Sequence, residues 1–407
     1  MNLDISAGHG RTREKPAAWG AVFAMALGAF TLVASEFMPV SLLTPIAADL
    51  RISEGQAGQA IAISGAFALL TSLFITSFAA RLDRKTLLLS LTALMMASGT
   101  VAAFAPNYLI FMAGRALVGV AIGGFWSLSA ATAMRLVPPD QVPRALAIVN
   151  GGNALATVVA APLGAFLGAI VGWRGAFFCV VPVAAIALAW KFASLPPMPA
   201  QRGAGAAGMV RLLKRPTVAF GMAAVSLFFM GQFALFTYLR PFLETVTRVS
   251  VSTLSLMLLV VGIAGFVGTA LIGTLLKDRL YRILVVFPVL MAGIALALTA
   301  FGSSAPATAA LLAAWGLLGT SAPVGWWTWL AQTLPREAEA GGGLMVAVVQ
   351  LAIMLGATVG GLLFDASGYQ ATFTMSAGVL VAASALAAMA ARAERRGRPA
   401  SSASVSP

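Results

Sequence analysis

Two charged residues lie inside long apolar stretches of this sequence, and their side chains are the best placed to do chemistry there. Glu36 lies in one apolar run and Arg115 in another. A charge at the centre of a membrane costs about 2.5–3.5 kcal/mol on insertion scales, so it is rare unless the protein uses it. Burial favours a neutral carboxyl group, whereas a nearby guanidinium favours a charged one. Glu36 and Arg115 therefore form a candidate proton-binding pair.

The residues that most enzymes need are missing. The only histidine, His9, lies in a polar amino-terminal segment, and the only cysteine, Cys179, lies in an apolar run. There is no GxSxG nucleophile motif, no GxxxxGK phosphate loop and no HExxH zinc motif. The net charge of +13 comes from residues scattered between apolar stretches, which argues against a nucleic-acid-binding face. We predict no enzyme activity, no cofactor, no metal site and no nucleic-acid partner.

The elements that must position the charged pair are membrane-spanning helices. Hydrophobic residues make up 60% of the 407 residues and charged residues only 10%, whereas about a quarter of a typical soluble protein is charged. About 20 apolar residues are needed for a helix to cross a bilayer. Such runs predict twelve spans, near residues 18–44, 58–80, 86–105, 108–133, 145–171, 175–195, 216–239, 253–276, 283–301, 308–334, 341–364 and 371–391.

The spans fall into two groups of six. The segment between them is rich in Pro, Gly and Ala and has no apolar run long enough to cross, so we interpret it as a linker. We predict an all-α membrane protein with twelve transmembrane helices in two pseudo-symmetric six-helix bundles. Its parts are an amino tail (1–17), an amino-terminal bundle (18–195), the linker (196–215), a carboxyl-terminal bundle (216–391) and a carboxyl tail (392–407).

The basic residues predict the orientation, because Lys and Arg are enriched in cytoplasmic loops. The tails, the linker and the loops on the same side hold 21 of the 26 basic residues. Only Arg115 is assigned to the inside of a span. Both termini are therefore expected in the cytoplasm. Four basic residues remain for the opposite loops: Arg51, Arg174, Arg240 and Arg248.

The two halves look like copies of one another when they are overlaid at a shift near 200 residues. Self-similarity of this kind indicates an internal repeat. The overlay places Gly172 on Gly368, and Trp315 opposite Arg115. It also places Leu117, Gly119 and Trp126 on Leu317, Gly319 and Trp326.

Short motifs add to this layout. A basic loop follows the second span of each half, Arg115 begins an Arg-x-x-x-Gly pattern in the fourth span, and Pro162-Leu-Gly164-x-x-x-Gly168 lies in the fifth. Together with twelve spans, these features resemble the major facilitator superfamily and its drug and proton antiporter branch. The resemblance implies transport by alternating access. It also implies a gating role for the loop residues Arg81, Asp83, Arg84, Lys85, Asp278 and Arg279.

Longer strings resemble the nucleoside exporters of that superfamily. They include EFMPVSLLTPIAADL at 36–50, NGGNALATVVAAPLGAF at 150–166 and YLRPFLE at 238–244. The resemblance implies proton-coupled antiport that exports purine ribonucleosides, of the inosine or guanosine type, across a bacterial inner membrane. Export of sugars or hydrophobic drugs is an alternative, and a non-transporting membrane receptor or scaffold is another. We expect a monomer in the lipid bilayer.

A purine is flat and polar at its edge, so its site needs aromatic faces together with amides or hydroxyls. Each candidate also has a plainer explanation, since aromatic residues anchor helices at the membrane surface and amides link helices to one another. The candidate substrate-binding residues are Ser35, Phe37, Trp126, Ser127, Asn150, Asn153, Gln232, Phe233, Phe236, Trp326, Trp327, Gln332 and Gln350.

The depths of Glu36 and Arg115 agree. Glu36 lies about eight residues, or ~12 Å, from the outer end of its span, and Arg115 lies about seven residues inside the fourth span. If the helices are neighbours, the carboxylate and the guanidinium can form an ion pair. This pair is either a structural salt bridge or a proton-coupling site. We expect coupling in the first half, and an uncharged aromatic and amide wall in the second.

Overall fold

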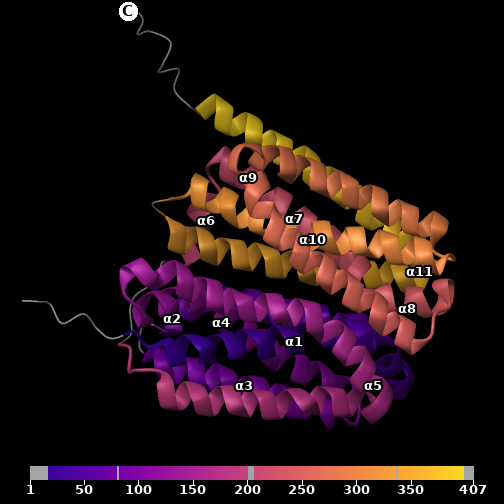
Figure 1. The fold of residues 1–407 in the computed structure, drawn as a ribbon, viewed down its shortest axis with the longest axis horizontal. Helices are drawn as coiled ribbons and strands as arrows, with labels where there is room; N and C mark the ends of the chain where they lie inside the picture. The colour runs from indigo at the N-terminus through magenta and orange to yellow at the C-terminus, as the bar shows by residue number, and fades with distance from the viewer. Residues whose placement is uncertain (1–16, 80–81, 200–205, 336, 398–407) are drawn as a thin grey trace, which may run out of the picture.

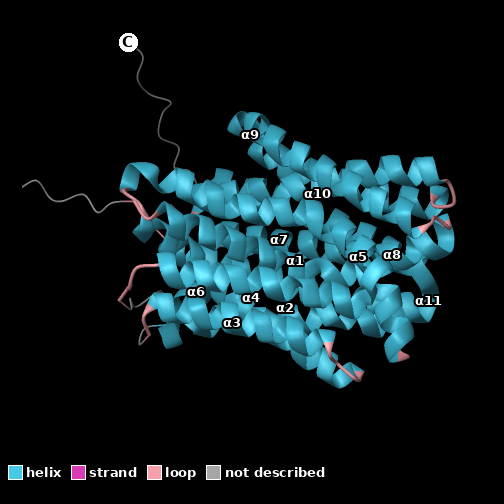
Figure 2. Ribbon diagram, turned by 60° about the horizontal axis from the view of Figure 1, so that its bottom comes forward, coloured by secondary structure: helices cyan, strands magenta, loops and turns pink. Residues whose placement is uncertain are grey.

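The computed structural model describes residues 17–79, 82–199, 206–335 and 337–397. Within these ranges the protein is helical and contains no β-strand (Figure 2). The apolar composition of the long helices explains this, because in a bilayer a helix satisfies all of its backbone hydrogen bonds internally.

The first half contains five long helices. Two of them begin at side-chain caps, since Asp83 accepts from backbone N–H groups at the start of α3, and Asn107 accepts from Ile110 at the start of α4 (3.0 Å). The elements are α1 (Trp19–Leu50), α2 (Glu54–Ala79), α3 (Arg84–Ala103), α4 (Tyr108–Leu136), a 3₁₀ turn (Pro139–Gln141) and α5 (Val142–Ser194).

The second half follows a short helix, α6 (Ala206–Leu212). A tight segment between its first two spans folds as a single turn of α-helix followed by a π-helical turn. The elements are α7 (Pro216–Thr237), α8 (Leu239–Phe242), the π-helical turn (Leu243–Thr247), α9 (Val251–Phe301), α10 (Ala305–Thr333) and α11 (Ala338–Gly397).

Ten helical segments among the described residues are long and apolar enough to cross a membrane. Two of them, Pro139–Ser194 and Ala340–Arg396, contain 56 and 57 residues, whereas about 20 residues suffice for one crossing. Each is interrupted by a glycine with positive φ, Gly172 (74°) in α5 and Gly368 (77°) in α11. Each therefore holds two spans, which confirms the twelve predicted from the sequence.

The helices form two bundles that lie side by side with roughly parallel axes (Figure 1). One bundle runs from α1 to α5, coloured indigo to magenta, and the other from α7 to α11, coloured orange to yellow. We call the end that carries the start of α1 and α6 the linker end, at the left of Figure 1, and the opposite end, near α8, the far end.

The backbone preserves the duplication. Among the described residues, two non-glycine positions have positive φ, Arg51 after the first span and Arg248 after the seventh, both at 56°. The two positive-φ glycines, Gly172 and Gly368, also occupy matching turns, between the fifth and sixth and the eleventh and twelfth spans. The shifts that relate these pairs are 197 (51 to 248) and 196 (172 to 368).

These shifts correct the register predicted for the fourth and tenth spans. α4 and α10 both contain 29 residues and begin at 108 and 305, again 197 apart. Small residues in α10 recur every three or four positions. An overlay of α4 on α10 at a shift of 200 residues therefore matches small residues about as well as one at 197. Trp126 and Trp326 therefore lie about one helical turn apart in the repeat, and Leu312, not Trp315, is opposite Arg115.

The packing of the helices supports the corrected register. A Cβ atom at Gly119 would overlap the carbonyl oxygen of Ser64, and one at Gly316 would overlap that of Val261. The two contacts are related by the same shift, because Gly316 lies 197 residues after Gly119 and Val261 lies 197 residues after Ser64. The same glycine-mediated approach of backbones therefore joins α2 to α4 and α9 to α10.

Candidate functional site

Arg115 is the most completely bound side chain of the candidate site. It is 1% exposed on α4, and its guanidinium makes four hydrogen bonds. Nε donates to the Ala60 carbonyl (3.1 Å), Nη1 to the Ser35 carbonyl (2.7 Å), and Nη2 to the Glu36 carbonyl (2.9 Å) and to Ser64 Oγ (3.1 Å). Arg115 thus ties α4 to both α1 and α2.

A proline explains why α1 offers Arg115 a carbonyl. Proline has no backbone N–H, so Pro39 leaves the carbonyl of the residue four positions earlier, Ser35, without its helical donor. An unsatisfied carbonyl in the membrane costs several kcal/mol. Nη1 of Arg115 donates to this carbonyl in place of the missing N–H group.

The predicted ion pair between Glu36 and Arg115 is not formed. Among the described residues, no carboxylate oxygen lies within 4 Å of the Arg115 guanidinium, because its donors are directed to the Ser64 hydroxyl and to backbone carbonyls, one of them that of Glu36 itself. The Glu36 carboxylate instead lies near the side chain of Gln350 on α11, in the other bundle.

Predicted aromatic residues do meet beside Glu36. Phe37 of α1 stacks on Phe233 of α7, with ring centroids 5.4 Å apart and 27° between the planes. Phe229 also stacks with Phe233, with ring centroids 6.5 Å apart, and Phe236 meets Phe233 edge-on at 6.1 Å. These four phenylalanines belong to an apolar cluster that draws on both bundles. We call Glu36, Gln350 and these phenylalanines the interface cluster.

Two amide side chains of the carboxyl-terminal bundle have unsatisfied oxygens. Gln350 is 5% exposed, and its Oε1 has no hydrogen-bond partner. Gln232, the residue before Phe233, donates from Nε2 to the Gly319 carbonyl (3.3 Å), and its Oε1 is likewise without a partner. Here too a proline, Pro323, frees the carbonyl four residues earlier.

The other predicted substrate residues differ in burial and contacts, and Trp126 packs with Phe37 against a small apolar cluster of α1 and α5. Ser35 is buried in α1 and serves Arg115 through its carbonyl. Trp326 is 1% exposed and packs on Trp329 within the carboxyl-terminal bundle. Asn150, Trp327 and Gln332 are exposed, whereas Trp126, Ser127 and Asn153 are half-buried.

The predicted gating loop is a linker-end structure. Asp83 accepts from the backbone of Lys85 (2.8 Å) and of Met198 (2.7 Å), so it both caps α3 and holds the chain that leaves α5. Arg84 is buried, and Lys85 lies 5.3 Å from the ring of Phe192. Arg279 is exposed where α9 departs from helical geometry. Arg81 and the side chain of Asp278 lie outside the described residues.

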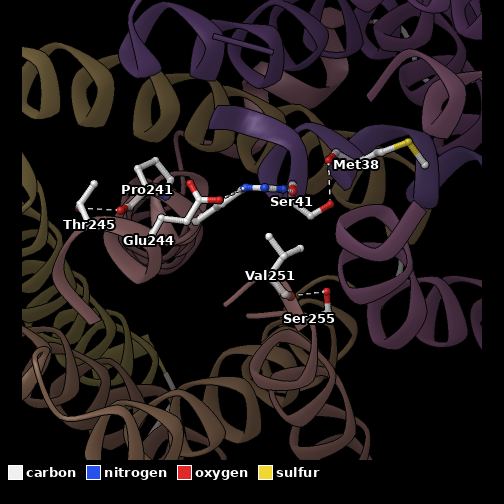
Figure 3. A network of polar contacts seen from close by, with 8 residues as sticks. Met38, Ser41, Pro241, Glu244, Thr245, Val251 and Ser255 are labelled. Atoms are coloured by element: carbon white, nitrogen blue, oxygen red, sulfur yellow. Dashed lines mark hydrogen bonds and ion pairs between the residues drawn. The ribbon is translucent and has the colours of Figure 1, made fainter. Parts of the chain in front are cut away.

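A second arginine, which the sequence analysis assigned only to an outer loop, joins the bundles at the far end. Arg240 is 6% exposed and donates from Nε to Glu244 (2.8 Å) and from Nη1 to the carbonyl of Ser41 in α1 (Figure 3). Pro45 leaves that carbonyl without a helical donor. A proline in α1 and an Arg-Glu pair spaced i,i+4 were the sequence signals for this contact.

The rest of the far-end contact involves α2 and α11. The Asp365 carboxylate accepts from Ser53 Oγ and from the backbone of Gly55 (2.9 Å), at the start of α2, where a helix favours negative charge. Thr358 donates to Gln59 Oε1 (3.1 Å). These hydrogen bonds join the two bundles, and we call this set with Arg240 and Ser41 the far-end latch.

The fold by itself defines a class of protein. Twelve spans in two repeated bundles, with buried charge and amides where the bundles meet, are the architecture of a membrane transporter. A family model described as "Major Facilitator Superfamily" matches residues 25–345. The chain belongs to the major facilitator superfamily, and it is a transporter rather than an enzyme.

Individual relatives agree on the family and differ in name. The chain is 63% identical over 385 residues to "Transcription regulatory protein OpdE" of Pseudomonas aeruginosa, covering 94% of this chain and 96% of the relative. It is 42% identical over 363 residues to "Purine ribonucleoside efflux pump NepI" of Salmonella paratyphi C, covering 89% and 91%. A crystal structure of a bacterial homologue of the human lysosomal transporter Spinster matches with a TM-score of 0.78 at 16% identity, covering 95% of this chain and all of that one.

Proposed function

We propose that this transporter exports purine ribonucleosides, of the inosine or guanosine type, in exchange for protons across the bacterial inner membrane. The observation that carries the proposal is the interface cluster, where stacked phenylalanines from both bundles meet, together with the unpartnered amide oxygens of Gln350 and of Gln232, the residue before Phe233. The rings offer faces for a flat base, and Gln350 and Gln232 offer acceptors for its N–H groups. The pump from Salmonella supplies the nucleoside class by analogy.

Glu36 is the proton carrier in this proposal. Arg115 fixes the backbone of α1 at Ser35 and Glu36, so the carboxylate stays in one place in the amino-terminal bundle. Its neighbour Gln350 belongs to the other bundle and leaves when the bundles separate. The surroundings of the carboxylate therefore change with each conformational step, and this couples protonation to transport.

The energy of one proton is sufficient. One charge that moves down 100 mV releases about 2.3 kcal/mol. This supports an approximately fifty-fold gradient of a neutral nucleoside, since 1.4 kcal/mol corresponds to a factor of ten. One proton per nucleoside is therefore enough to drive export, and a second would raise the attainable gradient.

The far-end latch defines the conformation in this proposal. With the termini in the cytoplasm, as the basic residues predict, the latch closes the periplasmic side. Because the latch holds the bundles together at the far end, we expect the linker end to be the side that opens to the cytoplasm. Nucleoside would then enter from the cytoplasm and reach the interface cluster.

Everted membrane vesicles that contain this protein would test the proposal. Given a proton gradient, they should accumulate labelled inosine but neither arabinose nor a cationic dye. Accumulation of arabinose or dye without inosine would assign the protein to the sugar or drug exporters instead. A vesicle preparation of the Glu36→Gln variant serves as the control for coupling.

A regulatory role is the second candidate, because the 63% identical relative is named as a transcription regulatory protein. In that role the protein would bind a ligand without moving it. Sealed proteoliposomes separate the two candidates. Inosine counterflow in purified protein supports transport, whereas binding of inosine without any flux supports a receptor.

A further inference from the structure

Lys191 is a further buried charged residue, and it lies in the last turn of α5. A lysine near a helix end normally extends towards the membrane surface to keep its amine in water. Lys191 does the opposite. Its side chain is 1% exposed, and its Nζ lies 2.9 Å from Thr92 Oγ1 and 5.2 Å from the centre of the Phe125 ring.

The amine lies deep in the amino-terminal bundle. Thr92 is eight residues into α3 and Gly28 is nine residues into α1, which places both about 12–14 Å from the linker end. Gly28 makes room for the lysine, since a Cβ atom there would come within 2.8 Å of Cε and closer still to Nζ. Burial at this depth is therefore built into the packing of α1 against α5.

The surroundings do not match a permanent ammonium. Leu32 of α1, Leu91 and Met95 of α3 and Ala121 of α4 complete the lining with Gly28, Thr92 and Phe125, and none of these residues is charged or titratable. Thr92 already donates to the Leu88 carbonyl (2.7 Å), so it accepts a single bond from the lysine. An ammonium has three donors, yet in the described structure one acceptor and one ring face it.

Arg115 shows how this chain binds a cation that stays charged, because four acceptors surround it in the same bundle. Lys191 has one. Beside it lies a cavity of about 10 Å³, about the space of a single water molecule. Lys191 is thus arranged like a neutral amine with access to one water.

We propose that Lys191 is a second proton-binding group of the amino-terminal bundle, neutral while it packs against Thr92 and Phe125 and protonated in the conformation in which water enters beside it. The inference rests on the proposed proton coupling. α1 covers Lys191 at Gly28 and carries Glu36 eight residues further along, so both groups lie along one helix. The amine takes one proton from water and returns it to water, with no other bond changed.

The first experiment needs no nucleoside. Purified full-length protein, Lys191→Met and the control Lys214→Met, which alters an exposed lysine, are unfolded thermally between pH 6 and pH 9. A lysine that is neutral when folded and charged when unfolded makes the wild type more stable as pH rises, up to tenfold in the unfolding constant per pH unit. We expect this slope in wild type and Lys214→Met, and its loss in Lys191→Met.

An identical slope in all three proteins would show that Lys191 keeps its proton in the folded chain, and the proposal would be wrong. Methionine is a flexible apolar side chain of similar length, so it should fill the site. If Lys191→Met does not fold, Lys191→Gln repeats the measurement, and the same comparison of slopes decides.

The second experiment counts protons in the transport reaction. Saturating inosine is added to purified protein in weakly buffered solution, and proton release is measured for wild type, Lys191→Met and Glu36→Gln. We expect each variant to release about half as many protons as wild type. Unchanged release from Lys191→Met would contradict the proposal. If inosine does not bind at all, the proposed substrate fails, and the thermal experiment still decides the role of Lys191.

Discussion

Two arginines bind α1 in the same chemical way but in different parts of the molecule. Arg115 takes the Ser35 carbonyl and Arg240 takes the Ser41 carbonyl, and in both cases a proline four residues later has removed the helical donor. Arg115 belongs to the same bundle as α1, whereas Arg240 comes from the other. The same bond therefore holds one bundle together and joins two bundles that must separate.

The remaining partners of each arginine agree with these roles, one within a bundle and one between bundles. Arg115 makes three further bonds, all within its own bundle, so its removal leaves several buried groups unsatisfied. Arg240 has a carboxylate of its own, Glu244, one helical turn away. When the bundles separate, Arg240 keeps that partner, so opening the far-end latch costs less than breaking the Arg115 site. Substitutions at these sites should therefore have effects of different size.

The largest effect is expected for Arg115→Met. This change leaves the carbonyls of Ser35 and Ala60 without their donor in the membrane, and removal of one partner from a buried charged network costs about 3–5 kcal/mol. We expect loss of folded protein, measured by size-exclusion chromatography in detergent, and loss of all transport. Arg240→Met should remain folded; if both variants unfold alike, the two sites do not differ as we argue.

Glu36→Gln should have the next largest effect, on coupling alone. The carbonyl of residue 36 still accepts from Arg115, so the fold is kept, but the carboxyl group can no longer exchange a proton. We expect accumulation of inosine against its gradient to fall to background while inosine exchange continues. The measurement is counterflow beside proton-driven uptake in the same vesicles, and uphill pumping by the variant would rule out Glu36 as the carrier.

Arg240→Met should shift the conformational balance by a smaller amount. Loss of the bond to Ser41 weakens the far-end latch by about 1–3 kcal/mol. In a Cys179→Ser background, a cysteine at Gln59 should then react several-fold faster with a membrane-impermeant maleimide added to whole cells. Arg248→Gln alters an exposed arginine near the same end and should leave the rate unchanged.

The smallest effect is expected at the interface cluster. Gln350→Leu removes a buried acceptor, and we expect an approximately ten-fold rise in KM for inosine, which corresponds to about 1.4 kcal/mol. Gln332→Leu is the matched control, because Gln332 is exposed on α10. Equal KM values in both variants would show that Gln350 does not contact the nucleoside.

Patterns that depend on length and composition were predicted correctly from the sequence. The twelve spans and the turns at Gly172 and Gly368 follow from apolar runs and glycine positions. To predict that Phe37 and Gln350 belong to one site with Phe233, one must know the helices and also how the two bundles pair. The apolar runs indicate the helices, and the resemblance to transporters indicates the pairing of the bundles.

The errors concern the rotation and register of helices. The similar depths of Glu36 and Arg115 predicted an ion pair between their side chains. The guanidinium instead donates to the Ser35 carbonyl, which Pro39 leaves without a helical donor. Arg240 lies close to a span end, where counting charges assigns a residue to a loop, and Lys191 lies near the end of the predicted sixth span, 175–195. Whether such a side chain turns inwards depends on the neighbouring helix, in these cases on Gly28 and Pro45, and a single sequence does not show which helix that is.

The dependence of Arg115 on main-chain carbonyls has a consequence for how such a protein can diversify. Three of its four acceptors are backbone atoms, present whatever side chain those positions carry. Substitutions at Ser35 or Ala60 can therefore accumulate without removing an acceptor, provided that Pro39 and the helix geometry persist. A binding surface can then change from one cargo to another while the frame that carries it stays intact.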